Sequence, residues 1–214
     1  LNECLYTKKG YTFSGWGTTA NGEVNYSDKA DYMMGTNAQY ILYAIWTPNN
    51  NTLHFESNGG SGKMSDITIA TDAKETLSAN AFTKTGYDFV GWAETENGSK
   101  VYSDGDSYTM GTENATLYAL WTPKTYKITY NLNGGQLAVQ NKATYNIETA
   151  TFTLNNPTKR GYEFKGWSGS NLTGNENQSV SIERGTYGEL TFTANWTAIE
   201  YSIIYNLNEG TNNS

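Results

Sequence analysis

The strongest constraint on the fold of this chain is a set of phrases that returns about every 75 residues. The first phrase, Gly-Tyr-x-Phe-x-Gly-Trp, occurs at residues 10–16, 86–92 and 161–167. The second, which ends in Trp-Thr, occurs at residues 42–47, 117–122 and 192–197. The third, a strand-like run that ends in Asn-Gly-Gly or Asn-Glu-Gly, occurs at residues 53–60, 128–135 and 203–210. A fixed period along a whole chain is the signature of tandem repeats, so we predict repeated units rather than one large domain.

The order of the phrases divides the chain into two complete units and two partial ones. We predict a partial repeat without its opening strand, two complete repeats and the opening strand of a further repeat, at residues 1–47, 51–122, 124–197 and 199–214 respectively. The link Thr47-Pro48-Asn49-Asn50 is only a few residues long. Short links favour units held in line, so we expect an elongated array rather than freely swinging domains.

Within each repeat the pattern is that of β-strands. Apolar and polar residues alternate along 126–132, and Leu117, Ala119 and Trp121 share one face of the closing phrase. Asn-Gly pairs predict turns after the opening strand at 58–59 and 133–134, and tight hairpins after the Gly-Trp strand at 21–22 and 97–98. The stretch from Asp72 to Phe82 is the one where a helical turn is expected. The predicted fold class is therefore mainly β.

Composition excludes several kinds of site and partner. Cys4 is the only cysteine and His54 the only histidine, so thiolate clusters, internal disulfides and sites with two imidazoles are excluded, and we predict no metal and no cofactor. The net charge of −7 argues against nucleic acid as a partner. No apolar run reaches the roughly 18 residues of a membrane helix, so no direct membrane insertion is expected. The first residues have no signal-peptide pattern, so we expect any export signal outside this chain.

The remaining polar candidates for chemistry are weak. Two carboxylates flank a glycine in Ser103–Ser107, but their spacing is not that of a calcium loop, and we predict a polar turn. His54 lies on the polar face of an opening strand and is predicted to face solvent. A Cys4–His54 dyad would be unique among units that otherwise copy one another. We therefore predict that the chain is not an enzyme.

The three phrases, taken in order, resemble the Listeria–Bacteroides repeat family, the B-repeat type of internalin-like bacterial surface proteins. The resemblance rests on the opening strand ending in Asn-Gly-Gly, on Gly-Tyr-x-Phe-x-Gly-Trp and on Leu-Tyr-Ala-x-Trp-Thr. It implies a β-grasp-like, ubiquitin-related small unit, secretion and attachment to a bacterial cell envelope, and it brings no catalytic residues. The third repeat departs from the pattern at Phe192–Trp196. We expect this departure to change the outer face of the repeat and not its fold.

Two sets of residues are the candidate structural and binding residues. The recurring aromatic residues are predicted to form the cores of the repeats: Trp16, Trp46, Trp92, Trp121, Trp167, Trp196, Tyr87, Phe89, Tyr162 and Phe164. Four apolar residues lie off the core face and either pack under a crossing segment or form an interaction surface: Tyr43, Ile45, Tyr118 and Leu120.

Repetition of core residues without a repeated polar constellation predicts a spacer. We expect an extracellular, non-enzymatic stalk of a bacterial cell-surface protein that projects other domains; the alternative is an adhesive module for a host protein or glycan. Residues 201–208 resemble an opening strand, and residues 1–47 lack one. We therefore also predict head-to-tail self-association, with the tail strand of one chain added to the head sheet of another.

Overall fold

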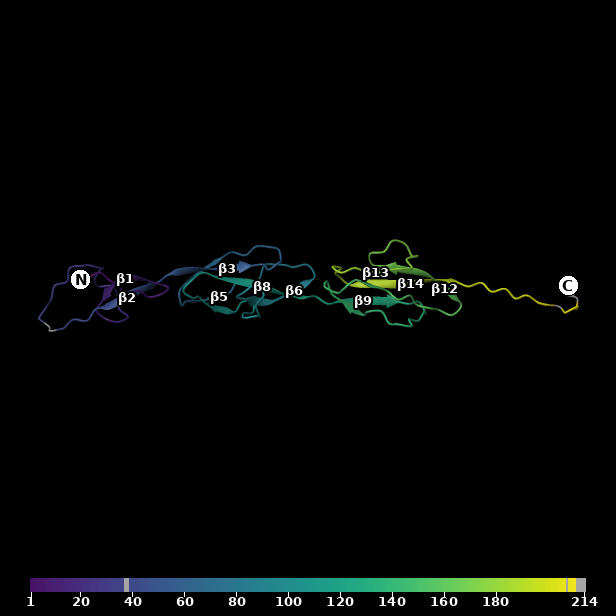
Figure 1. The fold of residues 1–214 in the computed structure, drawn as a ribbon, viewed down its shortest axis with the longest axis horizontal. Helices are drawn as coiled ribbons and strands as arrows, with labels where there is room; N and C mark the ends of the chain where they lie inside the picture. The colour runs from purple at the N-terminus through teal and green to yellow at the C-terminus, as the bar shows by residue number, and fades with distance from the viewer. Residues whose placement is uncertain (37–38, 207, 211–214) are drawn as a thin grey trace. The chain divides into compact units, whose positions relative to one another are not determined.

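The computed structural model describes residues 1–36, 39–206 and 208–210. Its chain divides into two compact units, Leu1–Thr122 and Pro123–Ser214. The regular structure of the described residues consists of β-strands, which confirms the prediction of a mainly β fold (Figure 1). Within those residues, no helix is long and apolar enough to cross a membrane.

The strands are short and follow the recurring phrases. Those of the first unit are β1 (Tyr11–Gly17), β2 (Tyr43–Pro48), β3 (Asn50–Glu56), β4 (Ile67–Ala70), β5 (Lys74–Thr76), β6 (Tyr87–Ala93), β7 (Ser107–Thr109) and β8 (Ala115–Pro123). Those of the second unit are β9 (Tyr126–Asn131), β10 (Thr144–Tyr145), β11 (Phe152–Thr153), β12 (Tyr162–Gly169), β13 (Ser181–Ile182) and β14 (Leu190–Ala198).

The second and third repeats share one sheet topology. The strand order is β4-β3-β8-β6 in the second repeat and β10-β9-β14-β12 in the third. In both, the opening strand runs parallel to the closing strand, so that Phe55 lies opposite Leu117 and Tyr130 opposite Phe192. Parallel neighbours cannot be joined by a tight turn, so the rest of the repeat crosses over between them. That crossover contains a further small sheet in each repeat, β5-β7 and β11-β13.

The core of the second repeat is built around Trp92, which is fully buried. The rings of Phe55, from the opening strand, and Phe89, from the Gly-Trp strand, each have their centroids 5.0 Å from that of Trp92. Leu53 and Leu117, from the paired opening and closing strands, are fully buried in the same cluster. The opening strand therefore supplies one wall of the core.

The third repeat repeats this arrangement with different neighbours. Trp167 is fully buried, with its centroid 5.6 Å from Phe164 and 6.1 Å from Tyr130 of the opening strand. Phe192 of the closing strand completes the cluster at 6.5 Å. The core positions thus recur while the residues that fill them vary.

The second tryptophan of each complete repeat joins the closing strand to the opening turn. Trp121 Nε1 donates to the Ser57 carbonyl at 2.9 Å, and Trp196 Nε1 donates to the Leu132 carbonyl at 3.0 Å. Both indoles are half-buried. These tryptophans therefore combine apolar packing with the same hydrogen bond to the backbone.

The predicted turns are confirmed in one place and wrong in another. Asn58-Gly59 and Asn133-Gly134 have positive φ angles, from 48° to 80°, and turn the chain after the opening strand as expected. The Asn21-Gly22 and Asn97-Gly98 pairs have no positive φ. The chain instead returns over a longer loop to Tyr102, whose carbonyl accepts from Trp92 N at 2.8 Å, so the predicted tight hairpin is wrong.

The helical turn expected between Asp72 and Phe82 is also wrong. Asp72 adopts a left-handed φ of 64°, which turns the chain out of any helix, and β5 follows and pairs with β7. Leu77 beyond β5 is buried in the core. Hydrogen bonds to a strand distant in the sequence therefore override the local preference of this segment.

The first repeat is a two-stranded sheet, β1-β2, among the described residues. Phe13 lies 5.2 Å from Trp16 and 5.5 Å from Trp46, so the aromatic cluster of the other repeats is present. Trp16 is nevertheless only half-buried, whereas Trp92 is fully buried. In the second and third repeats the opening strand forms one wall of the core, whereas among the described residues of the first repeat no strand takes that place.

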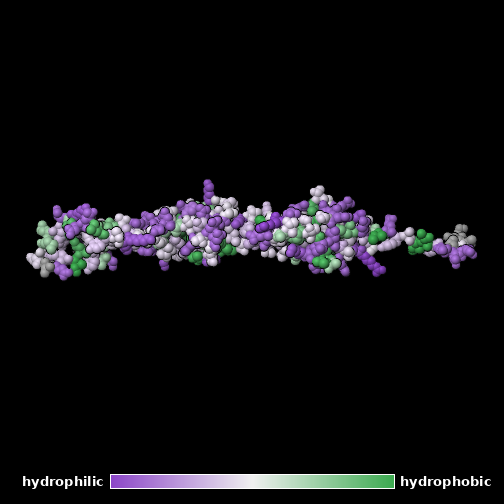
Figure 2. All heavy atoms as spheres, viewed as in Figure 1, coloured by the Kyte–Doolittle hydropathy of each residue, from purple (hydrophilic) through white to green (hydrophobic). Residues whose placement is uncertain are grey.

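The surface in view in Figure 2 is mostly hydrophilic, with scattered hydrophobic side chains.

Candidate functional site

Among the residues that the structure describes, the titratable groups do not gather into a reactive centre. Burial raises the pKa of the Tyr130 hydroxyl to about 12, because the ionised phenolate is poorly solvated in the core. Burial also raises the pKa values of Tyr108 and Tyr145. Within the described ranges, no three His, Cys, Asp or Glu side chains are close enough together to hold a metal ion.

His54 and Cys4 lie in separate environments. His54 Nδ1 lies 2.6 Å from Asp66 Oδ1, and its Nε2 lies 3.2 Å from Glu56 Oε1. These partners, Asp66 first, raise the pKa of the imidazole against the opposing effect of burial. Cys4 Sγ instead lies 3.9 Å from the Tyr6 carbonyl. Because both nitrogens of His54 face carboxylates, the structure does not bring the two residues together as a dyad.

The acidic loop at Ser103–Ser107 uses its carboxylates to hold backbone. Ser103 N donates to Asp106 Oδ2 at 2.6 Å, and Asn80 N donates to Asp104 Oδ1 at 2.8 Å. The carboxylates therefore stabilise a turn and its neighbouring segment.

The four residues considered as an interaction surface are only partly accessible. Tyr43 is 38% exposed, while Ile45, Tyr118 and Leu120 are half-buried. In the third repeat Asn195 takes the place of Leu120, and its amide donates to the Asn175 carbonyl at 3.2 Å. The loop after the Gly-Trp strand therefore passes close to this position.

A cation–π pair of a lysine and a tyrosine recurs in all three repeats, and the sequence analysis did not predict it. Lysine ammonium groups lie over tyrosine rings at 3.6, 4.7 and 4.0 Å from the ring centroids, in the pairs Lys8–Tyr11, Lys84–Tyr87 and Lys159–Tyr162. The signal was present as Lys-x-Gly-Tyr at residues 8–11, 84–87 and 159–162. Tyr162, predicted in the core, is 40% exposed because it faces this lysine rather than the core, and Tyr87 is half-buried.

Hydrogen bonds fix the junction between the first and second repeats. The Tyr11 hydroxyl donates to Asp72 Oδ2 at 2.6 Å. Asn49 N donates to the Gly10 carbonyl, and the Asn49 carbonyl accepts from Thr71 N, both at 2.9 Å. The connecting residue is therefore held by backbone bonds to both repeats.

The junction also contains a buried polar side chain. Asn51 Nδ2 donates to Thr71 Oγ1 at 3.0 Å and to the Gly111 carbonyl at 3.1 Å. Lys9 and Glu113 form an ion pair at 3.0 Å, but both side chains are about three-quarters exposed, so the pair adds little. The buried amide is the stronger constraint, because loss of a partner would leave a desolvated polar group.

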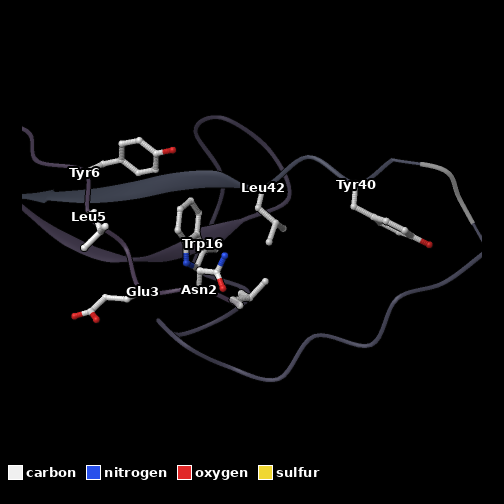
Figure 3. Close-up of a pocket in the computed structure, with 8 residues that line it drawn as sticks. Asn2, Glu3, Leu5, Tyr6, Trp16, Tyr40 and Leu42 are labelled. Carbon is white, nitrogen blue, oxygen red and sulfur yellow. The ribbon is translucent and has the colours of Figure 1, made fainter.

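A groove lies beside Trp16 in the first repeat (Figure 3). It has a volume of about 450 Å³ and is lined by Leu1, Asn2, Glu3, Leu5, Tyr6, Trp16, Tyr40 and Leu42. We call it the Trp16 groove. Tyr6 is equivalent to Phe82, which packs on Trp92 at 6.2 Å and is buried, whereas Tyr6 is 72% exposed. The groove thus occupies the place where the other repeats complete their core.

Comparison with known proteins places these features in a family. The family model of the Listeria-Bacteroides repeat domain matches residues 5–45, 52–120 and 126–195. These ranges contain the recurring tryptophan phrases, apart from the last residues of each closing phrase.

Three relatives show the same similarity. Two come from Evansella cellulosilytica: one carries the name of a Gly-rich membrane protein and is 31% identical over 95% of this chain, and the other carries the name of a membrane protein and is 30% identical over 94%. Internalin H of Listeria monocytogenes is 32% identical over 64% of this chain. The matches cover 23%, 29% and 24% of these relatives, so the chain spans about a quarter of their length. On the three family matches, the chain belongs to the Listeria-Bacteroides repeat domain family.

Proposed function

We propose that this chain is a non-enzymatic spacer in a bacterial surface protein, where it holds other domains away from the cell envelope. The observation that carries the proposal is the junction between the first two repeats. Asn49 is hydrogen-bonded on both sides and Asn51 is buried beside it, an arrangement that resists bending between these two repeats. A spacer requires resistance of this kind.

The difference between the surfaces of the two complete repeats supports the same role. Residues 51–122 carry 4 Lys and 10 Asp or Glu, whereas residues 124–197 carry 7 Lys or Arg and 5 Glu. Their net charges are therefore −6 and +2, although their cores match. A ligand recognised through charge by every repeat would require more similar surfaces, whereas a scaffold requires only the common core.

The location at a cell surface is part of the proposal. Relatives named as membrane proteins and as an internalin support it. We further infer a β-grasp-like unit for each complete repeat. The parallel pairing of opening and closing strands supports that inference, while the described residues between them form strands and loops without a helix.

Small-angle scattering of residues 1–214 tests the spacer role. A compact chain of this length has a radius of gyration of about 17 Å. We expect a clearly larger value, and a broader distance distribution for the double variant Asn51→Ala, Asp72→Ala, because it loses junction bonds. A radius near 17 Å for the unaltered chain would overturn the proposal.

Binding assays test the adhesive alternative. A spacer should give no specific signal on arrays of host proteins and glycans. A specific signal that is lost in Tyr43→Ala or Tyr118→Ala would favour adhesion instead, and would assign these half-buried residues to a binding surface.

A further inference from the structure

We propose that each complete repeat bears tension along the chain through its parallel clamp, the pair of β3 with β8 in the second repeat and of β9 with β14 in the third. The chain enters the second repeat at Asn50, the first residue of β3, and leaves it at Pro123, the last residue of β8. A pull on the chain therefore acts first on these two strands. This role rests on the proposed spacer function, because a stalk between an envelope and other domains is pulled along its chain.

The parallel pairing places the points of entry and exit at opposite ends of the strands. Leu53 of β3 lies opposite Ala115, and β8 continues from there to Pro123. At about 3.3 Å per residue along a strand and about 4.8 Å between strands, Asn50 and Pro123 are roughly 35 Å apart along the strands and roughly 5 Å apart across them. A pull through the chain is thus directed almost parallel to both strands.

The third repeat has the same geometry. Ile128 of β9 lies opposite Leu190, and β14 continues from there to Ala198. The chain enters this repeat at Tyr126, the first residue of β9. The direction of loading is therefore a property of the shared topology, although the residues of the two clamps differ.

Pulling along paired strands loads their hydrogen bonds together. For β3 to slide past β8, the bonds along the paired segments Leu53–Glu56 and Ala115–Tyr118 must break within the same short displacement. The other side of β3 is paired with β4, so that ladder is sheared as well. A pull across the strands would instead break the bonds one after another, each under the full load. The topology therefore opposes the first kind of pull more strongly than the second.

Sliding of the opening strand would also remove side chains from the core. Leu53 and Phe55 are 0% and 3% exposed, and Ile128 in the third repeat is 3% exposed. The ring of Phe55 lies 5.0 Å from that of Trp92. Packing contacts weaken within a displacement of about 1 Å. They therefore oppose the same short movement as the hydrogen bonds do.

A side chain adds one more bond at the loaded end of each clamp. Thr52 N donates to Asn114 Oδ1 at 2.8 Å, one position before the first paired residues. In the third repeat the equivalent Lys127 N donates to Glu189 Oε1 at 3.3 Å. Asn114 and Glu189 each stand directly before the closing strand. The bond thus recurs although the residue that supplies it does not, which marks these two positions as further parts of the clamp.

Single-molecule force spectroscopy of the full chain, in a Cys4→Ser background, tests the direction of resistance. With handles at both ends, the complete repeats should unfold in separate events, each lengthening the chain by roughly 200–230 Å, the extended length of a repeat less its folded span. In a second geometry the C-terminal handle is moved to Glu113→Cys. By the register of the clamp, position 113 lies opposite Asn51. The second repeat is then pulled across its strands and should open at a clearly lower force.

The control for this comparison is the Glu113→Cys chain pulled through both ends. The Glu113 side chain is 75% exposed, so the substitution itself should leave the unfolding force unchanged. Equal forces in the two geometries would overturn the proposal.

A matched pair of variants tests the bond at the loaded end. Asn114→Ala removes the acceptor of Thr52 N, and Asp104→Ala removes the acceptor of Asn80 N, a bond of the same 2.8 Å that lies outside the clamp. Forced unfolding follows the rate of unfolding and not the equilibrium stability. In end-to-end pulling, Asn114→Ala should lower the unfolding force of the second repeat and Asp104→Ala should not, even where urea denaturation shows equal losses of stability. Equal changes of force in the two variants would overturn the part assigned to Asn114.

The clamp and the spacer role fail separately. Scattering is recorded without tension, so a chain that is extended in solution but unfolds at equal forces in both geometries would keep the spacer role and lose the clamp. A compact chain with direction-dependent resistance would keep the clamp and lose the spacer role.

Discussion

At the scale of single residues, the two fully buried tryptophans differ in one hydrogen bond. Trp167 Nε1 donates to Asn156 Oδ1 at 3.0 Å. Trp92 Nε1 is buried with no hydrogen-bond partner among the described residues, because Ala81 occupies the equivalent of Asn156. A buried N–H group without a partner lowers stability. The repeats therefore share an indole position but not its polar contact.

Ala81→Asn should consequently stabilise the second repeat by about 1 kcal/mol, the net value of a typical hydrogen bond. The reciprocal change, Asn156→Ala, should destabilise the third repeat by about 1–3 kcal/mol, because it leaves Trp167 Nε1 unpaired. Chemical denaturation followed by tryptophan fluorescence measures both. A loss of stability in Ala81→Asn would show that the asparagine does not reach the indole.

His54 predicts a weak pH dependence. Hydrogen bonding to Asp66 raises the pKa of His54 in the folded state above its usual 6.5. The stabilisation is thus fully present below the unfolded-state pKa and is lost as the pH rises through the higher folded-state value. Its side chain is 46% exposed, so the effect should be small.

Thermal melting between about pH 5 and about pH 9 measures this effect, with His54→Gln as the comparison. The difference in stability between the wild type and His54→Gln should shrink as the pH rises. A difference that grows with pH would contradict the assigned ion pairs.

At the scale of elements, a glycine makes a bulge possible in the Gly-Trp strands of the first and third repeats. The β12–β14 register shifts between Phe164 and Gly166, and β1–β2 shifts at the equivalent Gly15. Gly166 has a φ of 140°, and a Cβ there would lie 2.4 Å from Asn177 N. The bulge directs the following Trp167 into the core and needs a residue without a side chain.

Gly166→Ala should therefore destabilise the third repeat strongly, by more than the roughly 1–2 kcal/mol of an alanine in left-handed conformation. Gly161→Ala is the control, because Gly161 also has a positive φ of 78° but has open space around its Cβ position. Urea denaturation of the two variants should separate backbone strain from steric overlap. Equal losses would show that the bulge can relax around a methyl group.

At the scale of the whole molecule, the division into two compact units predicts separate unfolding. Trp92→Ala removes the centre of the second repeat and should cost about 3–5 kcal/mol, comparable with the whole stability of a small unit. The first unit, Leu1–Thr122, should lose its transition while Pro123–Ser214 keeps its own. Calorimetry of the wild type and the variant measures this. If the wild type shows one transition and Trp92→Ala abolishes that transition completely, the two units unfold as one.

The repeat period, the strand alternation and the recurring tryptophans could be predicted from the residues. Trp92 and Trp167 stand at the end of the same short phrase, and both are buried in the structure. The Asn58-Gly59 turn was equally local, since both residues favour its positive φ angles. These features need no knowledge of which strand lies beside which.

Only the tertiary structure determined the features that depend on distant neighbours. The parallel pairing of β3 with β8 makes the opening strand a wall of the core, and the pairing of β5 with β7 replaces the expected helical turn. Tyr162, which the sequence placed in the core, lies outside it with the ammonium group of Lys159 over its ring. The Tyr11–Asp72 contact joins residues 61 positions apart. Sequence periodicity reports which residues need burial, whereas hydrogen-bond partners across the sheet and the junction are set by the folded backbone.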